Sequence, residues 1–384
     1  MGAGSCARAD RSTGVTGLGI FLFAAAILFS IGLHEFGHFI TAKKFGIKVE
    51  QFFIGFGPKI WSTRRGETEY GFKALPLGGF VRIAGMNPFE EVPEEDRGRI
   101  FKSRAPWKRA IVLAAGSFTH FVVALFIIAG VLSIAGVRDP DLPTTTIAAI
   151  SPNTPAATAG LKPGDRLVAI DGITVDSWTE TTDVIKARPG ETVEVEYIRN
   201  GVREEADVTI ASERPDGTKT GFLGVGPEFE LVKRSVPGAF VEAGKQIGTG
   251  AKASLLAFKD IFSPSTLGRL FSVATGDRER TVNDPATLIG IGNQAGHLAR
   301  TGNFAGLFYI IAGFNIFIGV ANLLPLPPLD GGHLAVLAYE KVTRREVDLR
   351  KLIPITAAVI SVFGALFVLL LYLDIVSPLP PIPG

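Results

Sequence analysis

Two histidines and a glutamate stand close together near the start of the chain, in the pentapeptide His34-Glu35-Phe36-Gly37-His38. On a helix, residues four apart lie on one face, so the imidazoles of His34 and His38 can reach the same metal ion. The carboxylate of Glu35 can then take a proton from a water molecule at that metal. This spacing is typical of zinc-dependent proteases, and it predicts a hydrolytic metal centre.

The pentapeptide directly follows residues 15–33, a run without charged side chains. A membrane-spanning helix needs about 20 apolar residues, so this run is long enough. No small-residue cleavage pattern follows it, which argues against a signal peptide. Charged groups and imidazoles inside a bilayer are costly and are functional by default. The metal centre is therefore predicted to lie within a membrane.

The composition also indicates a membrane protein, because 47% of the 384 residues are hydrophobic and only 20% are charged. Three further stretches lack Asp, Glu, Lys and Arg and can span: residues 111–137, 301–329 and 352–373. The fold class is thus a polytopic α-helical membrane protein with four transmembrane helices. The single cysteine, Cys6, excludes an intramolecular disulfide and a cysteine-based zinc site.

Basic residues concentrate between the first and second stretches and between the third and fourth. The positive-inside rule places these two loops in the cytoplasm, so both termini and residues 138–300 are expected outside. The protein is predicted in the cell membrane, with the lipid bilayer as a partner. No basic cluster with interleaved aromatic residues indicates binding to nucleic acid.

The third zinc ligand must come from elsewhere, because a catalytic zinc usually has three protein ligands and one open position. Residues 322–332 read Asn-Leu-Leu-Pro-Leu-Pro-Pro-Leu-Asp-Gly-Gly, and their prolines forbid a regular helix. Broken backbone at membrane depth is tolerated only where it lines a cavity or is buried in protein. Asp330, directly after the break, is therefore predicted as the third ligand. By topology, Asp330 and His34 both lie in the inner leaflet.

Two regions between the spans have strand character. Residues 49–83 are rich in Gly, Phe, Ile and Val with turn signals, and they predict either a cytoplasmic hairpin or a strand platform that enters the membrane. Residues 151–172 resemble a PDZ domain in their order of strand, short helix closed by Gly160, turn, strand and Asp-Gly turn. PDZ domains bind extended peptides by strand addition. The alternative is a domain that only shields the membrane site.

The pentapeptide, residues 322–332, the strand at residues 76–80 and the PDZ-like region together resemble the site-2 protease family, in its bacterial RseP-like form with one PDZ domain. The resemblance covers nearly the whole chain after the first dozen residues. It implies an intramembrane zinc endopeptidase that cleaves transmembrane helices of single-span membrane proteins, such as an anti-sigma factor already trimmed by an outer protease. It also implies Zn2+ bound by His34, His38 and Asp330, Glu35 as general base, and Asn322 as a substrate-positioning residue.

One position departs from the family pattern. Gly116-Ser-Phe-Thr-His120 replaces a small motif that more usually ends in Asn. His120 is predicted to position the substrate, although a lone histidine in an apolar helix is more often hydrogen-bonded to a neighbouring helix. His333 lies within one helical turn of Asp330 and is a rival ligand. We expect it either at the surface or in contact with the ligands without binding the metal itself.

The predicted organisation is a series of segments, followed by a Pro-rich tail from residue 377 that we expect to be disordered. The segments are a first transmembrane helix (15–42), a β-rich membrane-associated region (49–85), a second transmembrane helix (108–137), an inserted extracytoplasmic α+β PDZ domain (141–230), returning and interfacial helices (235–300), a third transmembrane helix with the broken motif (301–343) and a fourth (352–375).

Two other classes of protein fit the sequence less well. A catalytically silent, PDZ-bearing membrane receptor or chaperone would be free to lose His34, Glu35, His38 and Asp330, which are all present. A soluble-type zinc protease anchored in the membrane would normally place a third ligand soon after His38. Residues 40–46 contain no His or Glu, so the divided site is favoured.

Overall fold

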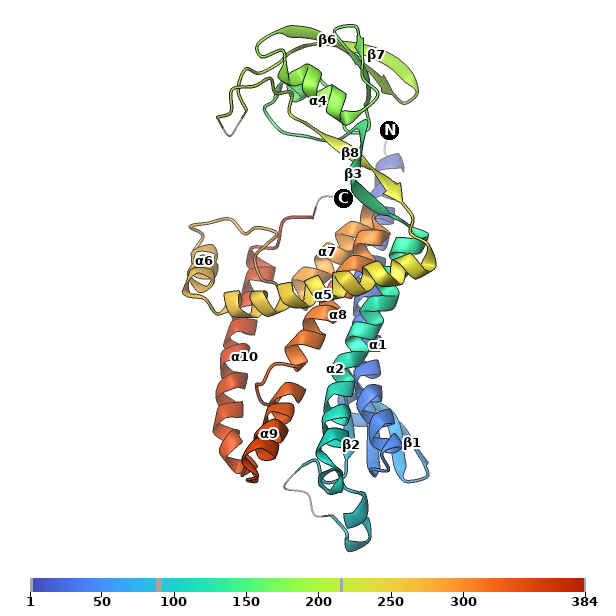
Figure 1. Ribbon diagram of the computed structural model, residues 1–384, viewed down its shortest axis with the longest axis vertical. Coiled ribbons are helices and arrows are strands. Elements are labelled where there is room, and N and C mark those ends of the chain that lie inside the picture. The colour runs from blue at the N-terminus through green and yellow to red at the C-terminus, as the bar shows by residue number, and fades with distance from the viewer. Residues whose placement is uncertain (1–2, 88–91, 215–216, 383–384) are drawn as a thin grey trace. The chain divides into compact units, whose positions relative to one another are not determined.

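The computed structural model describes residues 3–87, 92–214 and 217–382, and the chain divides into two compact units. The smaller unit is Leu132–Ser235, and the larger unit comprises the residues before and after it. The larger unit is helical except for one long hairpin (Figure 1). Its helices are α1 (Ala3–Lys44), η1 (Glu94–Arg99), η2 (Phe101–Ser103), α2 (Pro106–Ile134), α5 (Val236–Ile261), α6 (Pro264–Ala274), α7 (Leu288–Arg300), α8 (Phe304–Asn322), α9 (Asp330–Thr343), η3 (Leu349–Leu352) and α10 (Ile353–Val376).

Four helices in the described part of the chain are long and apolar enough to cross a membrane. They confirm the prediction of four apolar spans. The third span is shorter than the predicted 301–329, because helix α8 stops at Asn322, before the prolines, and a new helix begins at Asp330. The four spans are Gly14–Lys44, Pro106–Ile134, Phe304–Asn322 and Arg350–Val376.

Small residues allow α1 and α7 to pack closely. A Cβ atom at Gly19 would lie 2.6 Å from Ala299 Cβ, so this contact requires glycine. Phe23 and Ile27 of α1 then join Leu298 in a buried apolar cluster with α8. Helix α5 runs across α8 rather than along it (Figure 1). The sequence had indicated interfacial helices in this region but not which span they would cover.

A buried ion pair ties the last span to α7. Arg280 Nη1 lies 2.7 Å from Asp374 Oδ1, and the other carboxylate oxygen accepts hydrogen bonds from the backbone N–H groups of Thr287 and Gly290. This carboxylate caps the start of α7. The side chain of Gln294 bonds the backbone of residues 380 and 382, so the prediction of a disordered tail is wrong as far as residue 382.

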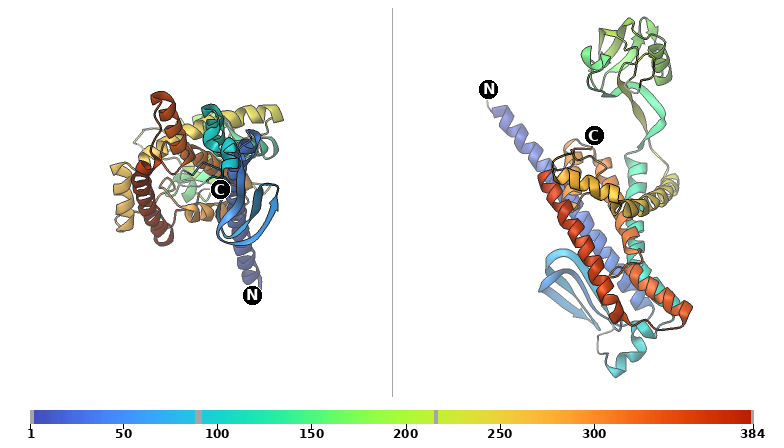
Figure 2. Two further views of the ribbon diagram at one scale, coloured as in Figure 1. Left: turned by 90° about the horizontal axis from the view of Figure 1, so that it is seen from below. Right: turned by 90° about the vertical axis from the view of Figure 1, so that its left-hand side faces the viewer.

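The hairpin consists of β1 (Val49–Arg65) and β2 (Thr68–Ile83), and each long strand acts as two shorter ones. Phe53 pairs with both Gly71 and Phe80, while Trp61 pairs with Phe72. The order across the sheet is therefore 59–65, 68–73, 49–54 and 79–83. Residues 79–83 form an edge, and the hairpin lies beside the second half of α1 (Figures 1 and 2).

The smaller unit is an antiparallel sheet of order β7-β6-β4-β3-β8, with β5 beside β4 and two short helices. The strand predicted between the two turns of residues 151–172 is β4. Ile170, Val195 and Ile210 are central to its apolar core. Its elements are β3 (Val137–Ile150), α3 (Pro155–Thr158), β4 (Arg166–Ile170), β5 (Ile173–Thr174), α4 (Trp178–Lys186), β6 (Thr192–Arg199), β7 (Val202–Thr209) and β8 (Val225–Val232).

Candidate metal centre

The two histidines of the pentapeptide lie on one face of α1, one helical turn apart. Their Nε2 atoms are 3.1 Å from each other. The Nδ1 atom of His38 is 2.7 Å from the backbone oxygen of Val112 in α2. Because a carbonyl only accepts, His38 donates from Nδ1, and its Nε2 atom keeps the lone pair that a metal ligand needs.

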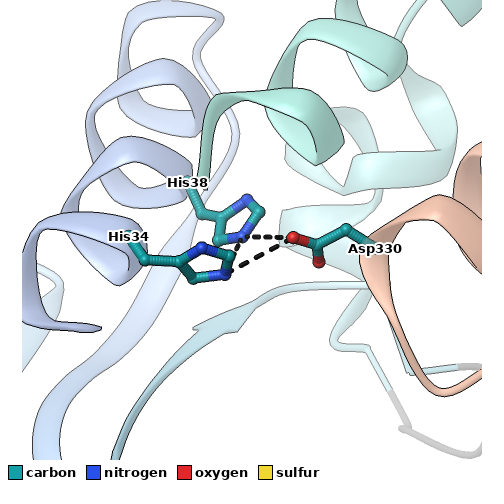
Figure 3. A group of neighbouring side chains, drawn as sticks. All are labelled: His34, His38 and Asp330. Atoms are coloured by element: carbon teal, nitrogen blue, oxygen red, sulfur yellow. Dashed lines mark hydrogen bonds and ion pairs between the residues drawn. The ribbon is translucent and has the colours of Figure 1, made fainter. Parts of the chain in front are cut away.

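Asp330 meets these histidines from the opposite side of the site (Figure 3). Its Oδ2 atom lies 3.4 Å from His34 Nε2 and 3.3 Å from His38 Nε2. Asp330 is the first residue of α9, which starts tight against the proline-rich loop. A Cβ atom at Gly331 would lie 2.2 Å from the backbone oxygen of Leu324, so only glycine permits this contact. The glycine thus fixes where the carboxylate stands.

The three ligand atoms fit a zinc ion. Zinc–nitrogen and zinc–oxygen bonds of about 2.0–2.1 Å in a tetrahedron separate neighbouring ligand atoms by about 3.3 Å. The observed separations run from 3.1 to 3.4 Å. Asp330 Oδ2 is buried, and it accepts no hydrogen bond from the described residues. Three protein ligands leave one tetrahedral position for water or substrate.

Helix α2 forms the wall behind the histidines. A Cβ atom at Gly116 would lie 2.3 Å from His38 Nε2 and 2.8 Å from His34 Nε2. A methyl group would therefore occupy the space into which both ligand nitrogens point. The absence of a side chain at this position keeps that space open.

Glu35 lies on the neighbouring face of α1, next to the edge strand 79–83. A Cβ atom at Gly79 would be 3.0 Å from Glu35 Cγ, so the glutamate side chain lies against this strand. The glutamate is therefore placed between the ligand group and the sheet edge. A carboxylate in this position can exchange protons with a group bound at either side.

The other residues considered for the site are His120, Asn322 and His333, and each lies in a different environment. His120 is buried, and its ring centroid is 5.2 Å from that of His34. Its Nδ1 atom is 3.0 Å from Asn315 Oδ1 in α8. This is a hydrogen bond to a neighbouring helix, as the alternative interpretation of His120 predicts. Asn322 is half-buried at the end of α8. His333 stands outside the group of three ligands and lines a cavity beside the edge strand.

Asn315 is a site residue that the sequence reasoning missed. It is fully buried and bonds His120, next to the ligands. A signal was present, because this amide interrupts the apolar sequence of α8 and polar groups inside a membrane span are functional by default.

A spanning helix that carries two histidines and a glutamate, with an aspartate brought to the same point by the helix after the third span, defines a metalloprotease of the membrane. The chain belongs to Peptidase family M50, whose profile matches residues 22–371. Zinc metalloprotease Rip1 of Mycolicibacterium smegmatis is 33% identical, with 94% of this chain and 98% of that protein covered. Rip1 of Mycobacterium tuberculosis is 34% identical over the same shares. Zinc metalloprotease RasP of Shouchella clausii is 29% identical, over 86% and 92%.

Among solved structures, the PDZ domain of an SdrC-like protein from Listeria monocytogenes is similar to 24% of this chain and 93% of its own length, at 26% identity and a TM-score of 0.20. The family and the relatives confirm the predicted intramembrane zinc metalloprotease with Zn2+ as its metal, in a multi-pass membrane protein.

The contact at Gly116 leads to a test of the metal centre. We expect Gly116→Ala to weaken zinc binding by at least about tenfold, because the new methyl group overlaps the space of His38 Nε2. Zinc content and affinity of the purified protein measure this. Gly130→Ala is the matched control in the same helix, since a Cβ atom there meets nothing within 4 Å. Equal zinc affinity in the two variants would contradict the role of Gly116.

Proposed function

We propose that this protein hydrolyses peptide bonds inside the transmembrane helices of single-span membrane proteins, with His34, His38 and Asp330 as zinc ligands and Glu35 as general base. The observation that carries this assignment is the meeting of three ligand atoms from two separate apolar segments beside one glutamate. Asn322 and His120 are proposed to position the substrate. An anti-sigma factor is the proposed substrate class.

Glu35 moves the protons in this mechanism. A zinc ion held by His34, His38 and Asp330 would polarise the scissile carbonyl and make a water molecule more acidic. Glu35 takes a proton from the attacking water as its oxygen bonds to the carbonyl carbon. The carbon–nitrogen bond then breaks, and Glu35 gives the proton to the departing amine. The hydrogen bond from His38 to Val112 holds one ligand ring in orientation throughout.

The edge strand 79–83 is proposed to hold the substrate. A transmembrane helix must unwind before its backbone carbonyl becomes accessible, and the released backbone groups then need partners. An exposed strand edge offers such partners by strand addition. The contact between Gly79 and Glu35 puts this edge next to the general base.

The proposed orientation places both termini and the smaller unit outside the cell, with the metal centre near the cytoplasmic face. The basic loops between the first and second spans and between the third and fourth spans support it, because both loops then lie on the cytoplasmic side. Within the larger unit, the hairpin and α9 lie at the end away from the chain termini (Figure 1). This is the end at which the ligands meet.

The smaller unit is proposed to bind a peptide segment of the substrate, as PDZ domains do. A cavity of about 260 Å³ lies between α4 and residues 221–227. Trp178, Ile185 and Leu223 give it an apolar lining, and Lys186 and Arg214 add positive charge. An extended segment with apolar and acidic side chains matches this lining.

We expect Glu35→Gln to lower kcat by at least about a hundredfold, because an amide cannot accept the proton. Cleavage of a single-span substrate with the topology of an anti-sigma factor is measured in proteoliposomes, and zinc content is measured alongside. A chelator should also stop the wild-type reaction. Activity that survives both the substitution and the chelator would refute the metalloprotease mechanism for this site.

We expect Val81→Pro to reduce kcat/KM by about tenfold or more, because proline removes the backbone donor at the strand edge. Val81→Thr is the control, since it keeps the amide and a β-branched side chain of similar size. Zinc content should remain unchanged in both. If Val81→Pro cleaves as fast as Val81→Thr, the edge does not hold the substrate.

A substitution that fills the cavity of the smaller unit tests whether this cavity binds the substrate. Thr182 lines the cavity, whereas Thr179 on the same helix is exposed and lies outside it. We expect Thr182→Trp, and not Thr179→Trp, to raise KM about tenfold for a substrate with its outer segment, a loss of about 1.4 kcal/mol of binding. A substrate trimmed of that segment should be unaffected. Faster cleavage of the longer substrate would instead show that the unit excludes bulky substrates.

A further inference from the structure

The two ligand histidines differ in the hydrogen bonding of their second ring nitrogen, Nδ1. His38 donates from Nδ1 to the backbone oxygen of Val112, whereas His34 Nδ1 is buried and has no hydrogen-bond partner among the described residues. Metal-binding histidines almost always donate their other ring N–H to an acceptor, which fixes the tautomer and the ring orientation. His34 therefore needs an acceptor near its Nδ1 atom.

The bond between Asn315 and His120 determines which nitrogen of His120 can accept. Asn315 Nδ2 donates to the backbone oxygen of Ile311 at 2.9 Å, which orients the amide so that Oδ1 faces His120. Since Oδ1 only accepts, the proton of neutral His120 is on Nδ1. The lone pair of His120 is therefore on Nε2.

This histidine is adjacent to the ring that needs an acceptor. The ring centroids of His34 and His120 are 5.2 Å apart, with 41° between the ring planes. Both His120 and Asn315 are at most 1% exposed, so bulk water does not compete at either side chain. The backbone of Gly116 also lies beside the His34 ring and is the rival acceptor.

We propose that Asn315 and His120 form a positioning pair for the metal centre, in which His120 Nε2 accepts a hydrogen bond from the neighbouring His34 Nδ1–H when His34 turns to bind the metal. This bond holds His34 in the tautomer whose Nε2 atom carries the lone pair toward the metal. The inference rests on the proposed role of His34 as a ligand. It gives His120 a role through His34, in place of the substrate contact proposed for it above.

The spacing along α2 supports this pairing. Val112, Gly116 and His120 are four residues apart and lie on one face of α2, opposite His38 and His34. One helix face thus supplies an acceptor for the first ligand ring, open space for the ligand nitrogens, and an acceptor for the second ring.

The test is metal binding by the purified full-length protein, titrated with Co2+ and with Zn2+. We expect His120→Leu and His120→Asn to raise the Kd by 10–100-fold and to change the visible Co2+ spectrum, because the outer partner of a ligand is lost. His120→Gln should restore most of the affinity, since its amide oxygen reaches the place of Nε2 whereas that of Asn reaches only the place of Nδ1. Asn315→Leu should weaken binding in the same direction, through the tautomer.

Ser30→Ala is the matched control, because Ser30 is buried in α1 one turn before His34, and among the described residues its hydroxyl bonds only within its own helix. Its Kd should equal that of the wild type. Unchanged Kd and spectrum in His120→Leu would overturn the proposal, as would equal losses in His120→Leu and His120→Gln, which indicate packing alone. The Tm of the metal-free variants is measured in parallel. If His120→Leu does not fold, the comparison of Gln with Asn and the Asn315→Leu variant decide.

His34→Ala separates this inference from the proposed function. If His34→Ala loses metal while His120→Leu keeps it, only the positioning pair is wrong. If His34→Ala itself binds metal with the wild-type Kd, the proposed ligand set is wrong as well.

Discussion

The low dielectric of a membrane-spanning bundle makes every unpaired polar group expensive, and the metal centre is built to meet that constraint. Two imidazoles and two carboxylates would each be destabilising alone in α1 and α9. They are stable together because α1 packs against α2 along residues spaced by four, with His38 opposite Val112 and His34 opposite His120. The register between these two helices is the condition on which the site depends.

The third ligand depends on a local feature of the chain, namely the break between α8 and α9. Prolines end the helix, and the glycines after Asp330 let the next helix start directly against the loop backbone. The packed backbone fixes the position of the carboxylate, but none of the described residues donates a hydrogen bond to its Oδ2 atom. This leaves Asp330 Oδ2 as a buried acceptor that faces two lone-pair nitrogens, an arrangement that a cation stabilises.

The sequence was sufficient for the parts of the site that are local. The spacing of His34 and His38, the apolar runs and the proline break before Asp330 each follow from short-range rules. Asn315 was missed because its partner is 195 residues away, and no periodicity shows which helix faces will meet. The strand order of the hairpin was missed for the same reason. A strand pattern predicts extended backbone, whereas the pairing of the inner segments 49–54 and 68–73 with two neighbours each depends on tertiary packing.

The position of Glu35 connects the metal centre to the substrate. A substrate helix that unwinds in the membrane loses hydrogen bonds that lipid cannot replace, at several kcal/mol for each exposed group. Pairing with residues 79–83 offsets this loss only at the sheet edge, so the peptide bonds that become accessible are those beside the edge. Since Glu35 lies against that edge and shares a helix with His34 and His38, the proposed mechanism confines unwinding and proton transfer to the same place. In this mechanism the hairpin selects the peptide bond that is cut, and the metal centre carries out its hydrolysis.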